Sequence, residues 1–94
     1  MKTQTSRIGE IMVVRLNNGE DILLSLRAAV AQHGIKHALI LGAMGSVTSY
    51  HVHVVENANM PPSDVFLKEE RPCDILSLNG VVMDGRVHAH IDLY

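Results

Sequence analysis

The sequence predicts an α+β fold, a mostly antiparallel β-sheet with one main α-helix. Two observations support this prediction. A single stretch in the first third of the chain has helical periodicity, and the segments after it alternate apolar and polar residues as strands do. One strand, one helix and then several strands is an order typical of α+β domains. Because 94 residues suffice for one small domain, we expect residues 1–94 to share a single core.

A first strand and the helix are expected on either side of a turn signal at residues 17–19. Residues 10–16 are mostly β-branched or apolar, which predicts the strand. Asn18 can cap the helix, and two acidic residues after the turn place negative charge in its first turn. Apolar residues then recur at helical spacing until Gly34, which should end the helix in the left-handed conformation.

The next two strands are predicted from different patterns. Residues 38–44 form a nearly uninterrupted apolar run, which is typical of a strand covered on both faces. Gly42 and Gly45 suggest a bulge or a close approach of the backbone there. Residues 49–55 alternate, so we expect one apolar and one polar face.

The second half of the chain predicts antiparallel hairpins. A loop is expected at residues 57–64, which contain a Pro-Pro pair, followed by a short strand at 65–68. Residues 74–83 and 86–94 read as two strands joined by the hairpin turn signal at residues 84–85.

Composition excludes several classes of protein. Hydrophobic residues make up 47% and charged residues 19%, a low charged share that favours self-association over a free monomer. The net charge of −2 makes nucleic-acid binding the less favoured hypothesis, because binding to a phosphate backbone usually requires an excess of basic residues. No apolar run reaches the length of a membrane span, and no signal peptide is recognised. Cys73 is the single thiol, so no intrachain disulfide can form, and we expect a cytoplasmic protein.

Two His-x-His pairs are the candidates for metal binding: His51 with His53, and His88 with His90. Residues two apart in a strand share a face at ~6.6 to 7 Å, so two imidazoles can converge on one ion such as zinc. Asp92 lies roughly 13 Å along the strand from His88, so the third ligand must come from elsewhere. Each pair also has a purely structural interpretation, as polar residues on a solvated strand face.

The remaining candidates favour a protein without catalysis. The two histidines near the end of the helix, His33 and His37, are interpreted as structural, because a histidine there interacts favourably with the helix dipole. Cys73 has no basic neighbour except Arg71 and is expected to be packed. Ser46 lacks the flanking residues of a nucleophile elbow, and no lysine or helix follows the adjacent glycines as in a phosphate loop.

Four segments together resemble the plants-and-prokaryotes conserved domain, the PPC family. They are Arg-Leu-Asn-Asn-Gly-Glu-Asp at 15–21, Gly-Ala-Met-Gly-Ser-Val at 42–47, Asp-Ile-Leu-Ser-Leu-Asn-Gly at 74–80 and Gly-Arg-Val-His-Ala-His-Ile at 85–91. Each segment alone is a weak signal, but their order over residues 10–94 is fairly specific.

This resemblance implies an antiparallel-rich α+β domain that assembles as a homotrimer. Plant members accompany an AT-hook and mediate protein interactions, and prokaryotic members are described as DNA-binding. The family's H-x-H falls on His88 and His90, which in relatives bind a metal with a histidine from a later G-G-H-L motif. The sequence lacks that motif, so we expect a domain short of its C-terminal hairpin, with strand 86–94 at a sheet edge.

Three functions follow as hypotheses. The first is a non-catalytic oligomerisation and interaction domain. The second is a DNA-associated regulator. The third is a zinc-type metal-binding protein or enzyme that uses His88 and His90, with further ligands from His51, His53 or a neighbouring subunit.

Overall fold

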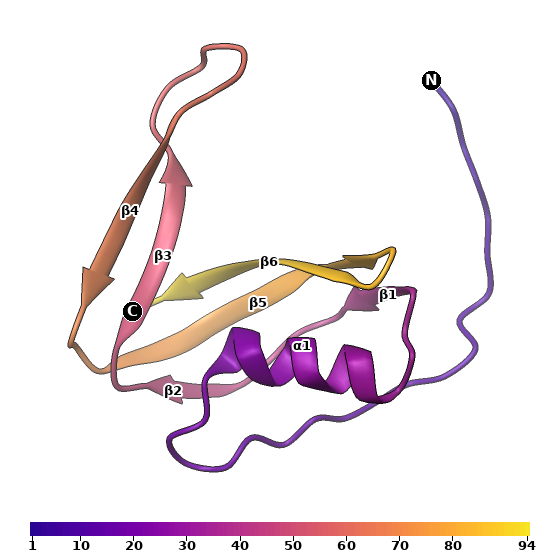
Figure 1. Cartoon of the computed structure of the whole chain (residues 1–94), viewed down its shortest axis with the longest axis horizontal. Helices are drawn as coiled ribbons and strands as arrows, with labels where there is room; N and C mark the ends of the chain where they lie inside the picture. The colour runs from indigo at the N-terminus through magenta and orange to yellow at the C-terminus, as the bar shows by residue number, and fades with distance from the viewer.

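The computed structural model describes all residues, 1–94, and confirms the predicted α+β class with one helix and six strands (Figure 1). The one helix, of 11 residues, falls short of the length that a membrane crossing needs. The elements, in chain order, are α1 Ile22–Gln32, β1 His37–Ile40, β2 Gly45–Val47, β3 Tyr50–Val55, β4 Asp64–Glu69, β5 Cys73–Met83 and β6 Arg86–Leu93.

Four strands form an antiparallel sheet, here called the main sheet, around the long strand β5. β6 pairs along one side of β5, and the shorter β1 and β2 pair with its two halves on the other side. α1 packs across one face of this sheet and contacts β6 (Figure 1). α1 is the one helix of the chain, so no second helix covers the opposite face.

The remaining strands, β3 and β4, form a separate two-stranded sheet, here called the arm. Their register runs from Tyr50 opposite Glu69 to Val55 opposite Asp64. The arm projects away from the main sheet, and the two sheets are continuous only through the chain (Figure 1). At its tip the predicted loop is present and is tied by Asn57, whose Nδ2 donates to Ser63 Oγ at 2.6 Å.

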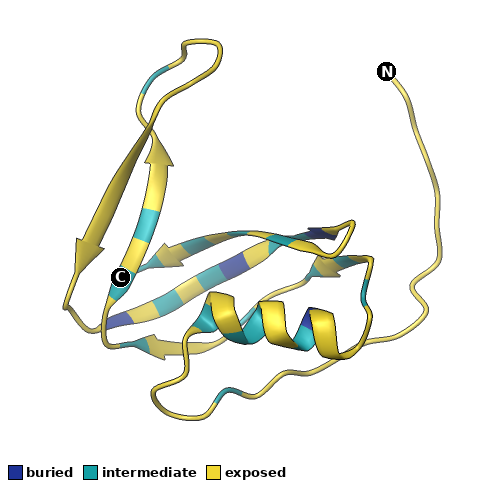
Figure 2. Ribbon diagram, in the orientation of Figure 1, coloured by how far each residue is buried: buried dark blue, intermediate teal, exposed yellow.

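The core is very small for a chain of this length. Only four residues are buried, and all lie on α1 or β5: Val30, Cys73, Leu78 and Val82 (Figure 2). The accessible surface is 8461 Å², whereas a compact monomer of 10.3 kDa exposes about 5,400 Å². The excess, about 3,000 Å², means that the chain leaves much of its apolar surface in contact with solvent.

The strand predicted at residues 10–16 is wrong, because these residues have no regular structure. Strand propensity alone does not make a segment a β-strand, because the backbone N–H and C=O groups of a strand need a neighbouring strand to bond with. No strand pairs with residues 10–16. Apolar side chains of the segment, including Val13, are therefore exposed.

The helix lies where it was predicted but starts later. Its N-cap is Asp21 instead of Asn18, and the Leu24 N–H donates to Asp21 Oδ1 at 2.8 Å. Glu20 accepts a hydrogen bond from the Asn17 N–H in the preceding turn. Gly34 follows the helix with φ 61°, which confirms the predicted left-handed end.

Only the first half of the apolar run at 38–44 forms a strand. β1 ends at Ile40, the next four residues are a loop, and β2 begins at Gly45 with φ 145°. The prediction that both faces are covered is wrong, because Leu39 and Met44 are exposed. The bulge or close backbone approach expected at Gly42 and Gly45 is not found there. The close approach lies at Gly80, where an added Cβ would be 2.2 Å from the His88 carbonyl oxygen, and the bulge lies between Ile75 and Ser77.

The predicted hairpin turn between β5 and β6 is confirmed. Asp84 and Gly85 have φ of 52° and 76°, the two positive values that a two-residue primed turn requires. This turn sets the register of β6 on β5, with Arg86 opposite Met83 and His88 opposite Val81.

Candidate metal centre

The pair His88 and His90 lies on β6, on the face of the main sheet that faces away from α1. The burial of β6 alternates strictly: the residues between and beside the histidines, Val87, Ala89 and Ile91, are half-buried, and the histidines are exposed. The predicted assignment of these two histidines to one polar strand face is confirmed.

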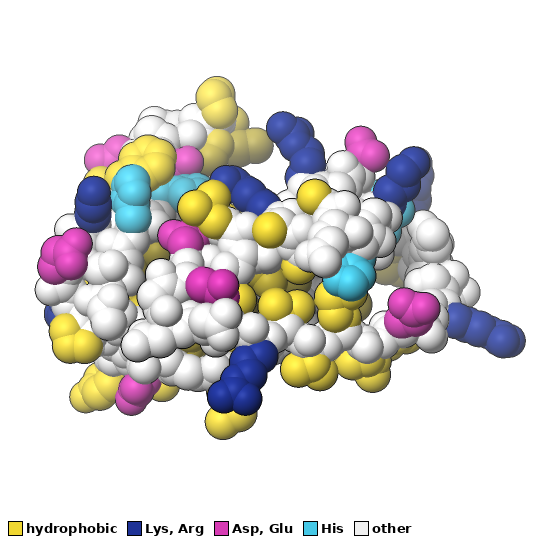
Figure 3. All heavy atoms as spheres, turned by 60° about the horizontal axis from the view of Figure 1, so that its bottom comes forward, with side chains coloured by type: hydrophobic (Ala, Val, Ile, Leu, Met, Phe, Trp, Pro, Cys, Tyr) yellow, Lys and Arg dark blue, Asp and Glu magenta, His cyan; other side chains and the backbone are white.

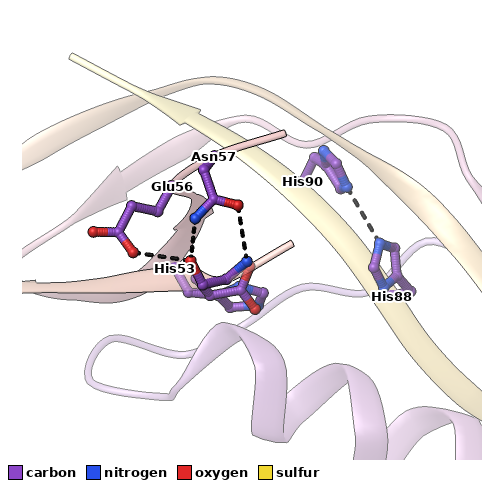
Figure 4. A network of polar contacts seen from close by, with 7 residues as sticks. His53, Glu56, Asn57, His88 and His90 are labelled. Atoms are coloured by element: carbon purple, nitrogen blue, oxygen red, sulfur yellow. Dashed lines mark hydrogen bonds and ion pairs between the residues drawn. The ribbon is translucent and has the colours of Figure 1, made fainter. Parts of the chain in front are cut away.

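The two imidazoles converge. Their Nε2 atoms are 3.2 Å apart, and their ring centroids are 5.2 Å apart. The dashed line in Figure 4 marks the contact between the two rings. Two nitrogens bound to one tetrahedral zinc at about 2.0–2.1 Å are separated by about 3.3 Å. The pair therefore fits two corners of a zinc site, and the same spacing serves a hydrogen bond between neutral rings when no metal is present.

Within one chain the histidine pair has no third ligand, since no three His, Cys, Asp or Glu side chains gather where they could hold a metal ion. Asp92 lies on the same exposed face of β6, and its Oδ2 accepts a hydrogen bond from Ser77 Oγ on β5. The chain by itself therefore brings together two imidazoles and no third ligand.

The second pair, His51 and His53, lies on the arm. Both rings flank Phe66, at centroid distances of 6.0 and 5.5 Å, and His53 Nδ1 lies 3.4 Å from Asp64 Oδ2. The structure brings neither of them into a metal-binding group with the histidines of β6. Their contacts agree with the structural interpretation of this pair.

The other two histidines, His33 and His37, take part in hydrogen bonds at the ends of secondary-structure elements. His33 is the C-cap of α1, and its backbone N–H donates to Ala29 O at 3.0 Å. His37 Nδ1 accepts a hydrogen bond from the Asp84 N–H at 3.4 Å, which links the start of β1 to the β5–β6 turn. Cys73 is buried and free, as predicted.

The base of the arm holds the one group with a resolved pKa shift. Partial burial raises the pKa of the Tyr50 hydroxyl above 10.0, and the hydrogen bond and negative charge of Glu69 raise it further. Glu69 is the residue opposite Tyr50 in the β3–β4 register. The neutral phenol is therefore the form that the folded arm favours.

Arg86 was not among the residues singled out from the sequence, whereas Asp92 was considered there as a ligand and judged too far from His88. Arg86 and Asp92 lie on the same face of β6 as the histidines and flank them symmetrically, each two residues from the nearer ring. The strict alternation of β6 is the signal that could have found Arg86. Elsewhere, the view in Figure 3 shows Lys and Arg side chains scattered, with acidic side chains between them.

Comparison with known proteins places the chain in a family. A family model described as the Plants and Prokaryotes Conserved (PCC) domain matches residues 3–93, which confirms the resemblance seen in the sequence. No curated protein and no solved structure matches the chain.

Proposed function

Since the chain belongs to the Plants and Prokaryotes Conserved domain family, we propose that it is a non-catalytic, homo-oligomeric interaction domain. The observation that carries this proposal is the size of the core, four buried residues in a chain of 94. A fold with so few buried side chains gains too little from its own hydrophobic burial to offset the entropy of ordering the chain. Association supplies the missing burial.

The amount of uncovered surface supports the same function. The excess of about 3,000 Å² over a compact monomer is of the size that obligate oligomers bury. The radius of gyration, 15.0 Å, likewise exceeds the ~12 Å of a compact domain of this length. Both quantities support association of the chain with further copies.

Of this surface, the arm depends most on a second chain for its stability. An isolated two-stranded hairpin is marginally stable in water, and one face of the arm is apolar. That face is formed by Val52, Val54, Val65 and Leu67, which are exposed or half-buried within the subunit. We expect a second copy of the chain to cover it.

Light scattering on the metal-free protein tests this function. The expected mass is a multiple of the chain mass at micromolar concentration, and three chains is the value that the family resemblance implies. A monodisperse monomer with intact circular dichroism would overturn the proposal.

Metal binding is the second candidate, and the 3.2 Å separation of the His88 and His90 Nε2 atoms favours it. Imidazole pairs bind zinc and related divalent metals. Elemental analysis of untagged protein purified without chelator should find metal in the wild type and none in His88→Ala. His51→Ala, a histidine change on the arm, is the matched control and should keep the metal.

DNA association is a third proposal, and it follows from the family resemblance alone. With a net charge of −2 and scattered basic side chains, any binding should be weak and strongly salt-dependent (Figure 3). Gel-shift titration of a duplex at low and at moderate salt tests it. If no shift is seen even at low salt, the proposal that the protein binds DNA is wrong.

A further inference from the structure

Two Asn-Gly dipeptides occur in the chain, at residues 18–19 and 79–80, and the fold holds them in different ways. Asparagine is among the thermally labile residues of proteins. It is most labile where glycine follows, because glycine has no Cβ to keep its backbone nitrogen away from the asparagine side chain. Both dipeptides are therefore candidates for spontaneous deamidation, and their surroundings decide which of them reacts.

The first dipeptide lies in the exposed turn before α1. Asn18 and Gly19 are its two central residues, and the Glu20 N–H closes the turn by donating to Asn17 O at 3.1 Å. Gly19 has φ 91°, a value that glycine adopts without strain. Both central residues are open to solvent, so water reaches the side-chain amide and the glycine nitrogen.

Both groups that would react in this turn are free of hydrogen bonds. The side chain of Asn18 makes none, since Asp21 caps the helix in its place. The Gly19 N–H donates to no group of the chain, because the hydrogen bonds of the turn join Asn17 and Glu20. An added Cβ at Gly19 would meet nothing within 4 Å, so no neighbouring atom obstructs the approach of the two groups.

The second dipeptide lies in the middle of β5, with a strand on each side. Gly80 is opposite Ile40 of β1 and also opposite Ala89 of β6. Asn79 is paired with His90. Reaction here requires the backbone to leave both neighbouring strands, and central strands open only at a free energy that approaches that of global unfolding. The chain therefore carries its own protected control.

We propose that Asn18 is a site of spontaneous covalent modification, at which Gly19 displaces ammonia from the side-chain amide and water opens the product to aspartate or isoaspartate. The Gly19 nitrogen forms a bond to Cγ of Asn18. The Cγ–Nδ2 bond breaks, and ammonia leaves with the proton of the Gly19 N–H. Water then cleaves either carbonyl–nitrogen bond of the cyclic imide and restores that N–H. This inference does not depend on the proposed self-association.

The two products differ in their effect on the start of α1. Each adds one negative charge to the net charge of −2, and a negative charge near a helix N-terminus is favourable. Aspartate keeps the length of the backbone. Isoaspartate directs the main chain through the side chain and lengthens the turn by a methylene group. We expect this longer turn to lose the hydrogen bond from the Glu20 N–H to Asn17 O and to loosen the start of the helix.

Peptide mapping of the full chain tests the site. Trypsin releases residues 16–27 with Asn18 and residues 69–86 with Asn79, because Arg71 is followed by proline. Samples aged at neutral pH, folded or in urea, are digested under mildly acidic conditions and measured by mass spectrometry. We expect Asn18 to convert at least about tenfold faster than Asn79 in the folded protein, and both at similar rates in urea. Equal rates in the folded protein, or reaction of Asn18 in urea alone, would overturn the proposal.

Two variants sharpen the test. Asn18→Ser removes the amide and should abolish conversion in residues 16–27 without affecting residues 69–86, whereas conversion that persists would belong to Asn17 and contradict the assignment. Asn18→Asp carries the charge of the product without the longer backbone. The isoaspartate form, separated by chromatography, should melt a few degrees below Asn18→Asp. Equal melting temperatures would refute the expected loosening of α1.

Discussion

The main sheet and the arm are both antiparallel β-structure, but they differ in what supports them. β5 lies between strands on both sides and has α1 across one face, and it carries three of the four buried residues. The arm consists of two strands without a helix, and none of the residues in these strands is buried. The difference shows that pairing alone does not bury side chains, because a second layer is required.

The largest effect is expected in the main sheet. Leu78→Ala removes a buried side chain of β5 beneath α1 and should lower the free energy of unfolding by about 2–5 kcal/mol. Leu76→Ala on the same strand, where the side chain is 64% exposed, is the control and should cost less than about 1 kcal/mol. Urea unfolding followed by circular dichroism measures both. Similar losses would mean that the outer face of β5 is covered as well.

A substitution on the arm should change the strength of self-association. Leu67→Asp places a charge on its apolar face and should weaken self-association by about 10- to 100-fold, corresponding to roughly 1.5–3 kcal/mol for a buried leucine. The circular dichroism of the subunit should change little. Lys68→Asp, one residue further and on the opposite face, is the matched control. Light scattering over a dilution series measures the effect, and an unchanged mass would show that this face stays uncovered.

Gly80→Ala tests how tightly β5 and β6 approach. A Cβ at this position would meet backbone atoms of His88 and Ala89 at 2.2 and 2.7 Å, so the strands must separate. We expect a loss of about 1–3 kcal/mol in thermal unfolding. Gly42→Ala meets nothing within 4 Å and should be tolerated. Equal melting temperatures for the two variants would contradict the close approach.

The smallest effect is the titration of Tyr50 at the base of the arm. Its raised pKa means that the neutral phenol stabilises the folded arm below pH 10, and that this contribution is lost as the pH rises through the raised value. In a Tyr94→Phe background, phenolate absorbance should have its midpoint above 10.0. Glu69→Gln should lower the midpoint, and a wild-type midpoint at or below 10.0 would refute the shift.

Local signals predicted the β5–β6 hairpin and its histidines. The Asp-Gly turn demands positive φ at both positions, and the alternation of β6 assigns His88 and His90 to one face regardless of the rest of the fold. Both features depend only on neighbouring residues. Most of the candidate site could therefore be read from the sequence.

Properties that depend on distant partners could not be predicted in this way. Residues 10–16 have strand propensity, but a strand exists only where another strand offers its hydrogen bonds. The close approach at Gly80 looks like any strand glycine until β6 is placed beside it. The convergence of the two Nε2 atoms likewise depends on side-chain rotamers that spacing leaves open.

The β-bulge between Ile75 and Ser77 changes which residues of β5 face α1. Before the bulge the side chains turned toward α1 are odd-numbered, as at Cys73, and after it they are even-numbered, as at Leu78 and Val82. Leu76 is thus the extra residue of the bulge, and it shifts the alternation of inward and outward side chains along β5 by one position. Deleting it would restore a regular ladder in which both halves of β5 keep their present faces, because Ile75 and Ser77 already pair with the adjacent residues Leu93 and Asp92 of β6.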